Sequence, residues 1–167
     1  MQSKLSGKKF TLTKGEHNIN ARILDILRSK SHTYISGEQL SQELKMSRTA
    51  VWKHVNALRE LGYRVEAITS VGYKLISSPS LLVPLEIKNG LATQYIGQNI
   101  HWYYEVNSTN TRAIHLAEQG EKVAPEGTLV ISESQKQGRG RMGRTWISRP
   151  ETGIYLSLIL RPTFAPV

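Results

Sequence analysis

Two helix-start signals, eleven residues apart, constrain the fold of this chain most strongly. The first is Ser36-Gly37-Glu38-Gln39, which matches a capping box, in which the serine accepts a backbone hydrogen bond and the glutamine reaches back. The second is Ser47, a preferred N-cap residue that follows Leu44 by three positions. Two capped helices joined by so tight a turn predict a helix-turn-helix.

The apolar residues around these signals repeat at helical spacing. They predict a first helix over roughly residues 18–30, a short second helix that ends near Lys45, and a third helix from Ser47 to about Leu61. Gly62 stands where a left-handed residue often ends a helix.

A pair of strands follows the third helix. Residues 63–68 alternate between apolar and polar, residues 72–76 return as a second strand, and the turn between them includes Thr69 and Gly72. Helix, helix-turn-helix and hairpin, in this order, are typical of a winged-helix domain.

Positive charge is concentrated in the same part of the chain. The whole chain carries a formal net charge of +9. Residues 1–77 hold 13 lysines and arginines against 6 acidic residues, whereas residues 78–167 hold 9 against 7. A basic first half indicates a polyanionic partner such as nucleic acid. A soluble surface that is merely basic is the alternative.

The third helix has an outward face suited to DNA. Burying its apolar stripe leaves the following residues outside: Arg48, Thr49, Trp52, Lys53 and Asn56. Arginine and asparagine can reach base edges, while lysine and threonine can contact the phosphate backbone. A winged helix that makes only protein contacts is the competing interpretation.

A polar segment with a proline, Ser77-Ser78-Pro79-Ser80, indicates a domain boundary. We therefore expect a DNA-binding domain over residues 1–77, a linker over 78–84 and a second domain over 85–167. The expected elements of the second domain are a short helix past Pro84, strands at 100–106, 128–131 and 153–160, and a helix capped within 107–110. They suggest a mixed α/β sheet.

Between the last two of these strands lies Gly138-Arg139-Gly140-Arg141-Met142-Gly143-Arg144-Thr145-Trp146. Glycines let the backbone approach a ligand, and arginines attract carboxylate or phosphate, so we expect a flexible anion-binding loop. The run also fits a dinucleotide fingerprint and a P-loop, but both need a helix here, which Pro150 would stop. An arginine–glycine RNA-binding tail is disfavoured because the run lies between strands.

The sequence contains no pattern typical of a metal site, a membrane span or a secretion signal. The five histidines have no metal-ligand spacing, so no metal site is predicted. No apolar run approaches the roughly 20 residues of a membrane span, and the N-terminal residues contain no apolar signal segment. Cysteine is absent. A cytoplasmic protein without membrane contact fits best.

The loop, the upstream triplet Ser108-Thr109-Asn110 and Gln135 together resemble the biotin protein ligase family. The helix-turn-helix, from Gly37 to Val55, is similar to that of its bifunctional members, and the likeness covers nearly the whole chain. The fold class implied is α+β: an N-terminal winged helix-turn-helix followed by the N-terminal part of a mixed α/β biotin/lipoate ligase-type catalytic domain.

This resemblance implies an enzyme that is also a repressor. Such proteins form biotinyl-5′-AMP from biotin and Mg²⁺-bound ATP, then pass biotin to a lysine of the biotin carboxyl carrier protein of a carboxylase. Their adenylate-loaded form dimerises and binds the operator of the biotin genes. The expected cofactors are biotin, ATP and Mg²⁺, and the expected partners are operator DNA, the carrier protein and a second copy.

The resemblance also implies roles for individual residues. The catalytic residues would be Arg139 and Arg141. Biotin would contact Ser108, Thr109, Asn110, Gln135, Arg139, Gly140 and Arg141. The adenylate loop would add Gly138, Gly143, Arg144 and Trp146.

One departure concerns the end of the chain. Family members continue through a further strand, whose lysine contacts the activated acyl group, and through a small β-barrel. We therefore expect this chain to be a C-terminally truncated member. The alternative function, from another class, is a DNA-binding regulator that senses a small anionic ligand without complete catalytic machinery.

Overall fold

The computed structural model describes residues 9–12, 19–30 and 32–163 and divides the chain into two compact units. The first unit consists of residues 17–81 and is mostly helical. The second combines residues 1–16 with residues 82–167 and contains a five-stranded sheet. None of the described helices has the length and apolar character that crossing a membrane requires.

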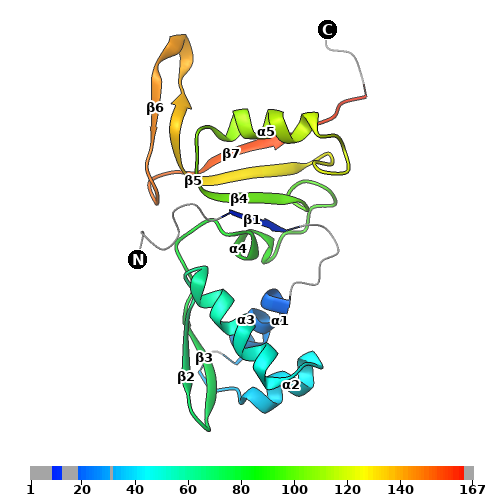
Figure 1. Ribbon diagram of the computed structural model, residues 1–167, viewed down its shortest axis with the longest axis vertical. Coiled ribbons are helices and arrows are strands. Elements are labelled where there is room, and N and C mark those ends of the chain that lie inside the picture. Colours follow the sequence, from blue (N-terminus) through cyan, green and yellow to red (C-terminus); the bar gives the residue numbers. More distant parts are fainter. Residues whose placement is uncertain (1–8, 13–18, 31, 164–167) are drawn as a thin grey trace. The chain divides into compact units, whose positions relative to one another are not determined.

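Three helices form the core of the first unit (Figure 1). They are α1 (Ile19–Ser29), α2 (Gly37–Leu44) and α3 (Arg48–Glu60). Their inward side chains are almost completely buried: Ile23, Leu24, Leu27, Leu40, Leu44, Val51, Val55 and Leu58. Because each such side chain contributes about 1.5–3 kcal/mol when buried, this stripe supplies the main favourable term for folding the unit.

The two predicted caps are confirmed. Ser36 Oγ accepts the backbone N–H of Gln39 at 3.0 Å, and the Gln39 side-chain oxygen accepts the N–H of Ser36 at 3.1 Å. Ser47 Oγ accepts the N–H of Ala50 at 3.2 Å. Between the helices, Lys45 adopts a left-handed conformation with φ 54° and ends α2. The predicted helix-turn-helix is therefore present.

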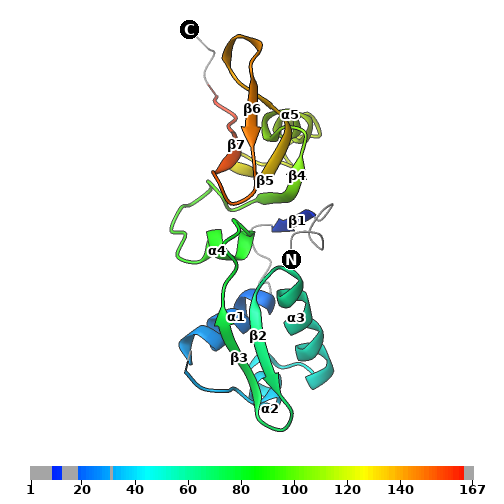
Figure 2. The ribbon, with the colours of Figure 1, turned by 90° about the vertical axis from the view of Figure 1, so that its left-hand side faces the viewer.

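The predicted hairpin is also present and is pinned to the chain ahead of α2. Its strands are β2 (Arg64–Ile68) and β3 (Gly72–Ser77), and its tip lies at the same end of the unit as α2 (Figure 2). Ile35 and Tyr73 exchange two backbone hydrogen bonds of 2.9 Å each. At Gly72 φ is +137°, and a side-chain carbon would lie 2.2 Å from the carbonyl oxygen of Ile35. Only glycine fits this position.

The sheet of the second unit is mixed, as predicted. Its strands are β1 (Lys9–Leu12), β4 (Ile100–Val106), β5 (Thr128–Arg139), β6 (Thr145–Ser148) and β7 (Tyr155–Ile159). The order is β1-β4-β5-β6, and β7 also pairs with β5. The paired strands β4 and β5 are parallel, whereas β1 with β4, β5 with β6, and β5 with β7 are antiparallel. The long strand β5 pairs with β7 in its first half and with β6 near its end.

Helices lie on the sheet of the second unit. Helix α5 (Thr109–Glu118) connects the parallel strands β4 and β5 and covers one face of the sheet (Figure 1). Its inward residues form a buried cluster with the strands: Ala113, Leu116, Ala124, Val130 and Ile159. Trp102 in β4 is fully buried, and the short helix α4 (Pro84–Lys88) packs near β1 and β4.

The predicted domain limits differ from the structure at both ends of the first unit. Residues 9–12, assigned to the DNA-binding domain 1–77, form β1 and pair with β4, with Lys9 opposite Tyr103 and Leu12 opposite Ile100. The predicted linker 78–84 is divided, since residues up to Leu81 group with the first unit. A four-residue edge strand carries too little pattern to reveal a partner about ninety positions away in the sequence.

Candidate functional site

A hollow of about 370 Å³ opens at the carboxyl ends of β4 and β5, beside the start of α5. Ligands commonly bind at this position in α/β units, because loops and a helix N-terminus meet there. Six of the residues predicted to bind the adenylate line the hollow: Ser108, Thr109, Asn110, Gln135, Arg139 and Trp146. Residues up to 38 positions apart in the sequence are thus brought to one site.

Gln135 uses both ends of its side-chain amide within the hollow. Its Oε1 accepts the backbone N–H of Thr109 at 2.8 Å and the hydroxyl of Thr109 at 3.2 Å. Its Nε2 donates to Ser148 Oγ at 3.0 Å, while Ser157 Oγ donates to Thr109 Oγ1 at 3.0 Å. This network joins α5, β5, β6 and β7, so the polar groups are held in place before any ligand arrives.

The start of α5 makes one wall of the hollow electropositive. Ser108 is the N-cap residue, and its side chain accepts the N–H of Thr111 at 3.5 Å. Ser108 and Thr109 are buried, whereas Asn110 is exposed. A helix N-terminus attracts negative charge through its free N–H groups and its dipole. This wall therefore favours an anion.

Arg139 and Trp146 stand on the paired strands β5 and β6 and also line the hollow. Arg139 lies opposite Thr145 in the ladder of these strands, and Gly138 lies opposite Trp146. The side chain of Arg139 has no hydrogen bond or ion pair with any other residue that the structure describes. Trp146 is 59% exposed. A guanidinium and an indole face are thus both available to a ligand that carries a charge and a ring.

The prediction that the glycine–arginine run is a loop is wrong, because most of the run forms a β-hairpin. Strand β5 continues to Arg139, β6 begins at Thr145, and a single 3₁₀ turn, η2 (Arg141–Gly143), joins them. The N–H of Gly140 donates to the carbonyl of Arg144 at 2.8 Å across this hairpin. Backbone pairing, which composition does not reveal, orders the segment. A strand follows the run where a nucleotide motif needs a helix, which confirms the exclusion of both motifs.

The other predicted loop residues lie outside the hollow. Arg141, Gly143 and Arg144 are exposed at or beside the turn. Gly138 is buried, and a side-chain carbon there would lie 2.5 Å from the carbonyl oxygen of Trp146. The glycine is thus needed for close packing of the hairpin. The predicted ligand contacts of Gly138, Gly140, Arg141, Gly143 and Arg144 stay predictions.

Strand β7 adds residues that sequence reasoning missed. Tyr155, Leu156 and Ser157 line the hollow, as does Ile154 just before the strand. Ile154 is 69% exposed and Leu156 is 48% exposed, so part of the wall is apolar and open. In the sequence these residues read only as a buried strand, and no pattern there indicates a ligand.

The predicted DNA-binding face lies in the first unit. Arg48, Thr49, Trp52 and Lys53 are exposed on α3. Asn56 is half-buried, and its Oδ1 accepts from Arg59 Nη1 at 3.1 Å. A groove of about 440 Å³, lined by Arg48, Trp52 and the residues of the hairpin tip, separates α3 from the wing. Their contacts with DNA stay predictions.

A buried carboxylate lies in β5 two positions before Gln135. Glu133 is 3% exposed, and its Oε1 accepts from Trp102 Nε1 at 2.8 Å and from the N–H of Leu82 at 2.9 Å. Burial raises the pKa of Glu133 above its ordinary value of 4.5, although the two donors partly oppose this shift. The folded protein therefore binds a proton at Glu133 more tightly than the unfolded chain does.

This shift predicts a pH dependence of stability. The contribution of Glu133 is fully present below its unfolded pKa and is lost as the pH rises through its raised folded pKa. Glu133→Gln keeps an acceptor oxygen but does not titrate. We expect the melting temperature of the wild type, followed by circular dichroism, to fall relative to that of Glu133→Gln as the pH rises above about 4.5. Glu118→Gln, an exposed change in α5, should follow the wild type. Parallel curves for wild type and Glu133→Gln would contradict the assignment.

Comparison with known proteins assigns both units. Residues 20–74 match a helix-turn-helix domain, and residues 102–166 match the biotin/lipoate A/B protein ligase family. Residues 102–166 thus belong to the biotin/lipoate A/B protein ligase family. The hollow described above lies within the part that matches the ligase family, and α2 and α3 lie within the helix-turn-helix match.

Two bifunctional ligase/repressors named BirA illustrate the similarity. The protein from Bacillus subtilis (strain 168) is 44% identical over 140 residues, which are 84% of this chain and 42% of the relative. The protein from Escherichia coli (strain K12) is 37% identical over 130 residues, which are 75% of this chain and 37% of the relative. The chain thus spans less than half the length of these two relatives.

Proposed function

We propose that this protein activates biotin with ATP and transfers it to a lysine of a biotin carboxyl carrier protein. The observation that carries the proposal is the hollow beside α5, where Gln135, Arg139 and Trp146 meet the triplet Ser108 to Asn110. The bifunctional ligase/repressors to which the chain is similar support the same reading.

The groups in the hollow suit the first half of this reaction. The biotin carboxylate attacks the α-phosphorus of ATP, a new P–O bond forms, and pyrophosphate leaves. Two anions must approach each other, so a fixed cation such as Arg139 and the positive end of α5 lower their repulsion. The amide of Gln135 and the hydroxyl of Thr109 offer donors and acceptors to the ureido ring of biotin, and Trp146 offers a face to the adenylate.

The second half passes the acyl group to the carrier. The lysine amine attacks the acyl carbon and AMP leaves. We propose that Mg²⁺ enters bound to the phosphates of ATP, its usual ligands in nucleotide-dependent enzymes. Mg²⁺ supplies charge neutralisation on the nucleotide, and this chain's residues supply binding and orientation.

A labelling experiment tests the proposal directly. The chain is incubated with biotin, Mg²⁺ and ATP labelled at the α-phosphate, and bound label is identified by chromatography; synthetic biotinyl-5′-AMP is titrated separately by calorimetry. We expect one biotinyl-AMP bound per chain. Absence of binding would overturn the proposal. Binding of the synthetic adenylate without formation of labelled adenylate would favour the alternative, a regulator that senses an anionic ligand.

We also propose that the first unit binds operator DNA and represses biotin genes. The exposed basic face of α3 beside a hairpin supports a contact with DNA. Ligand-dependent dimerisation would let two such units occupy two half-sites. Because ATP, the carrier protein and DNA are all cytoplasmic in bacteria, such a protein would act in the cytoplasm.

Lys53 provides a test of the phosphate contacts. Its side chain is exposed on α3 and has no hydrogen bond or ion pair with another described residue. We expect Lys53→Ala to weaken binding to every duplex alike and to reduce the salt slope by about one unit, as measured by fluorescence anisotropy at several salt concentrations. Loss of affinity for one sequence only would mean that Lys53 contacts a base instead.

A further inference from the structure

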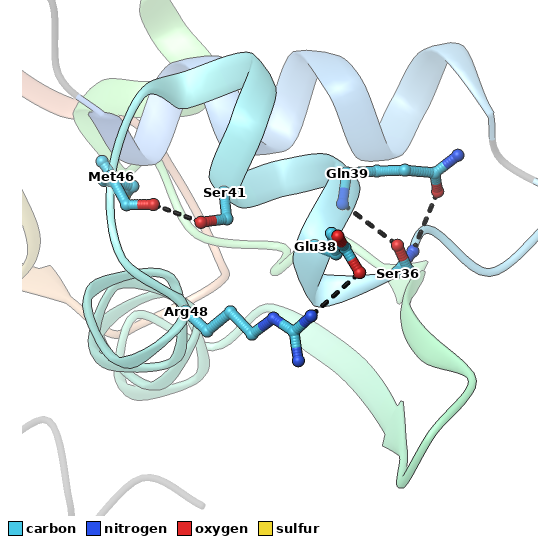
Figure 3. Close-up of polar contacts among 6 residues, drawn as sticks. All are labelled: Ser36, Glu38, Gln39, Ser41, Met46 and Arg48. Atoms are coloured by element: carbon cyan, nitrogen blue, oxygen red, sulfur yellow. Dashed lines mark hydrogen bonds and ion pairs between the residues drawn. The ribbon is translucent and has the colours of Figure 1, made fainter.

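An exposed ion pair joins the two helices of the helix-turn-helix. Arg48 is the first residue of α3 and Glu38 is the second residue of α2. Arg48 Nη2 lies 2.9 Å from Glu38 Oε2 (Figure 3). The side chains are 69% and 61% exposed. An ion pair so open to solvent contributes only about 0–1 kcal/mol to stability. Stabilising the fold is therefore a minor role of this pair.

Hydrogen bonds of the helix caps and the turn fix the backbone around this ion pair. The capping box of Ser36 and Gln39 fixes the start of α2, and Ser47 caps α3. The Ser41 hydroxyl donates to the carbonyl of Met46 and closes the turn between the helices (Figure 3). Glu38 and Arg48 therefore project from two helix starts whose separation is set by the turn, and not by the ion pair itself.

The ion pair leaves several donors of the Arg48 guanidinium unoccupied. Arg48 uses one N–H of Nη2 toward Glu38, and its Nε and Nη1 have no partner among the residues that the structure describes. Each pair of parallel donors in a guanidinium includes one N–H of Nη2, and Nη2 has a second N–H beside the one directed to Glu38. Arg48 also lines the groove between α3 and the wing, together with Trp52 and the tip residues 67–73. Donors remain available on the face that the proposed function assigns to DNA.

We infer that Glu38 is a positioning residue that holds the guanidinium of Arg48 for readout of one guanine in the major groove. The inference rests on the proposed DNA-binding function. Arginine recognises guanine with two parallel donors directed to O6 and N7, and a carboxylate that engages another part of the fork limits the rotamers of the long side chain before DNA arrives. Glu38 thus restricts the conformations of the Arg48 side chain, and Arg48 makes the base contact.

The inference predicts a change in sequence preference rather than in general affinity. Wild type, Glu38→Gln and Arg48→Ala select from a randomised duplex pool, and affinities for the preferred and a scrambled duplex are then measured by anisotropy. We expect both variants to lose the guanine preference at the same position. Glu38→Gln should bind the preferred duplex about tenfold more weakly and the scrambled duplex no more weakly than wild type does. The double variant should resemble Arg48→Ala.

Glu43→Gln is the matched control. Glu43 lies exposed on the same helix α2, and its side chain makes no ion pair or hydrogen bond with another described residue. The variant Glu43→Gln removes the same negative charge as Glu38→Gln and should keep the guanine preference of the wild type. Circular dichroism melts show whether each variant is folded; Glu38→Gln is nearly isosteric, and the pair adds little stability.

Three outcomes would overturn the inference. If Glu38→Gln binds all duplexes more tightly by one factor, the carboxylate merely masks Arg48. If Arg48→Ala alone loses the guanine preference, Glu38 does not position it. If wild type binds all duplexes without preference, both this inference and the proposed operator binding are wrong. If wild type keeps a preference that Glu38→Gln does not change, only the inference is wrong.

Discussion

Replacing Gly72 by alanine is expected to destroy the wing and, with it, most DNA binding. At φ +137° the backbone is in a region that residues with a side chain rarely adopt, and the new carbon would lie 2.2 Å from the Ile35 carbonyl oxygen. Strain of this kind costs about 1–3 kcal/mol for the backbone alone. The clash also breaks the two hydrogen bonds between Ile35 and Tyr73. We expect a total loss of about 3 kcal/mol or more in unfolding free energy.

Urea unfolding followed by circular dichroism measures this loss, and anisotropy measures the accompanying change in DNA affinity. Gly37→Ala is the control in the same unit, because its φ is not positive and a side-chain carbon would meet only the Tyr73 ring at an ordinary 3.6 Å. It should unfold like wild type. Equal unfolding curves for Gly72→Ala and Gly37→Ala would mean that the wing is not pinned as described.

Removing the guanidinium of Arg139 is expected to weaken adenylate binding roughly tenfold to a hundredfold, since a hydrogen bond to a charged group contributes about 1.5–3 kcal/mol. Arg139 lines the hollow, and its side chain has no partner within the described part of the chain, so its removal leaves no other protein group unpaired. Calorimetric titration of biotinyl-5′-AMP into Arg139→Ala measures the change, and stopped-flow release of the bound ligand measures its rate.

The variant Arg141→Ala shows whether the effect of Arg139→Ala depends on the position of the arginine or only on its charge. It removes the same positive charge two residues further along, but Arg141 lies in the turn of the hairpin and does not line the hollow. If the hairpin keeps its position when the ligand binds, we expect a change of less than about threefold, the effect of a screened charge at a distance. A change as large as that of Arg139→Ala would support the predicted ligand contact of Arg141. A larger effect for Arg141→Ala than for Arg139→Ala would mean that the hairpin tip folds onto the ligand.

Local sequence signals are sufficient to predict the elements whose structure depends on residues close together in the chain. The capping box at Ser36, the cap at Ser47 and the turn before Gly72 each depend on residues within about four positions. Hence the helix-turn-helix and the wing followed from spacing alone. The triplet after β4 likewise predicted the start of α5, because Ser108 is a strong N-cap residue.

Pairings across the chain could not be derived in this way. The extension of β5 through Arg139 depends on β6, and the strand at Lys9 depends on β4. Composition suggested mobility for the run from Gly138, although its glycine is required for close approach to the Trp146 carbonyl. The contribution of Ser157 to the hollow also depends on a partner distant in sequence, Thr109.

The hydrogen bonding of the Gln135 amide has a consequence for selectivity. Its oxygen accepts from both the N–H and the hydroxyl of Thr109, and its nitrogen donates one hydrogen bond, to Ser148. A ligand donor that reaches the oxygen must therefore displace a group of Thr109, whereas a ligand acceptor can use the second N–H of the amide. Leaving a displaced donor unpaired costs about 1–3 kcal/mol. The resting network thus favours a ligand that presents an acceptor to this amide, such as the carbonyl oxygen of a cyclic urea.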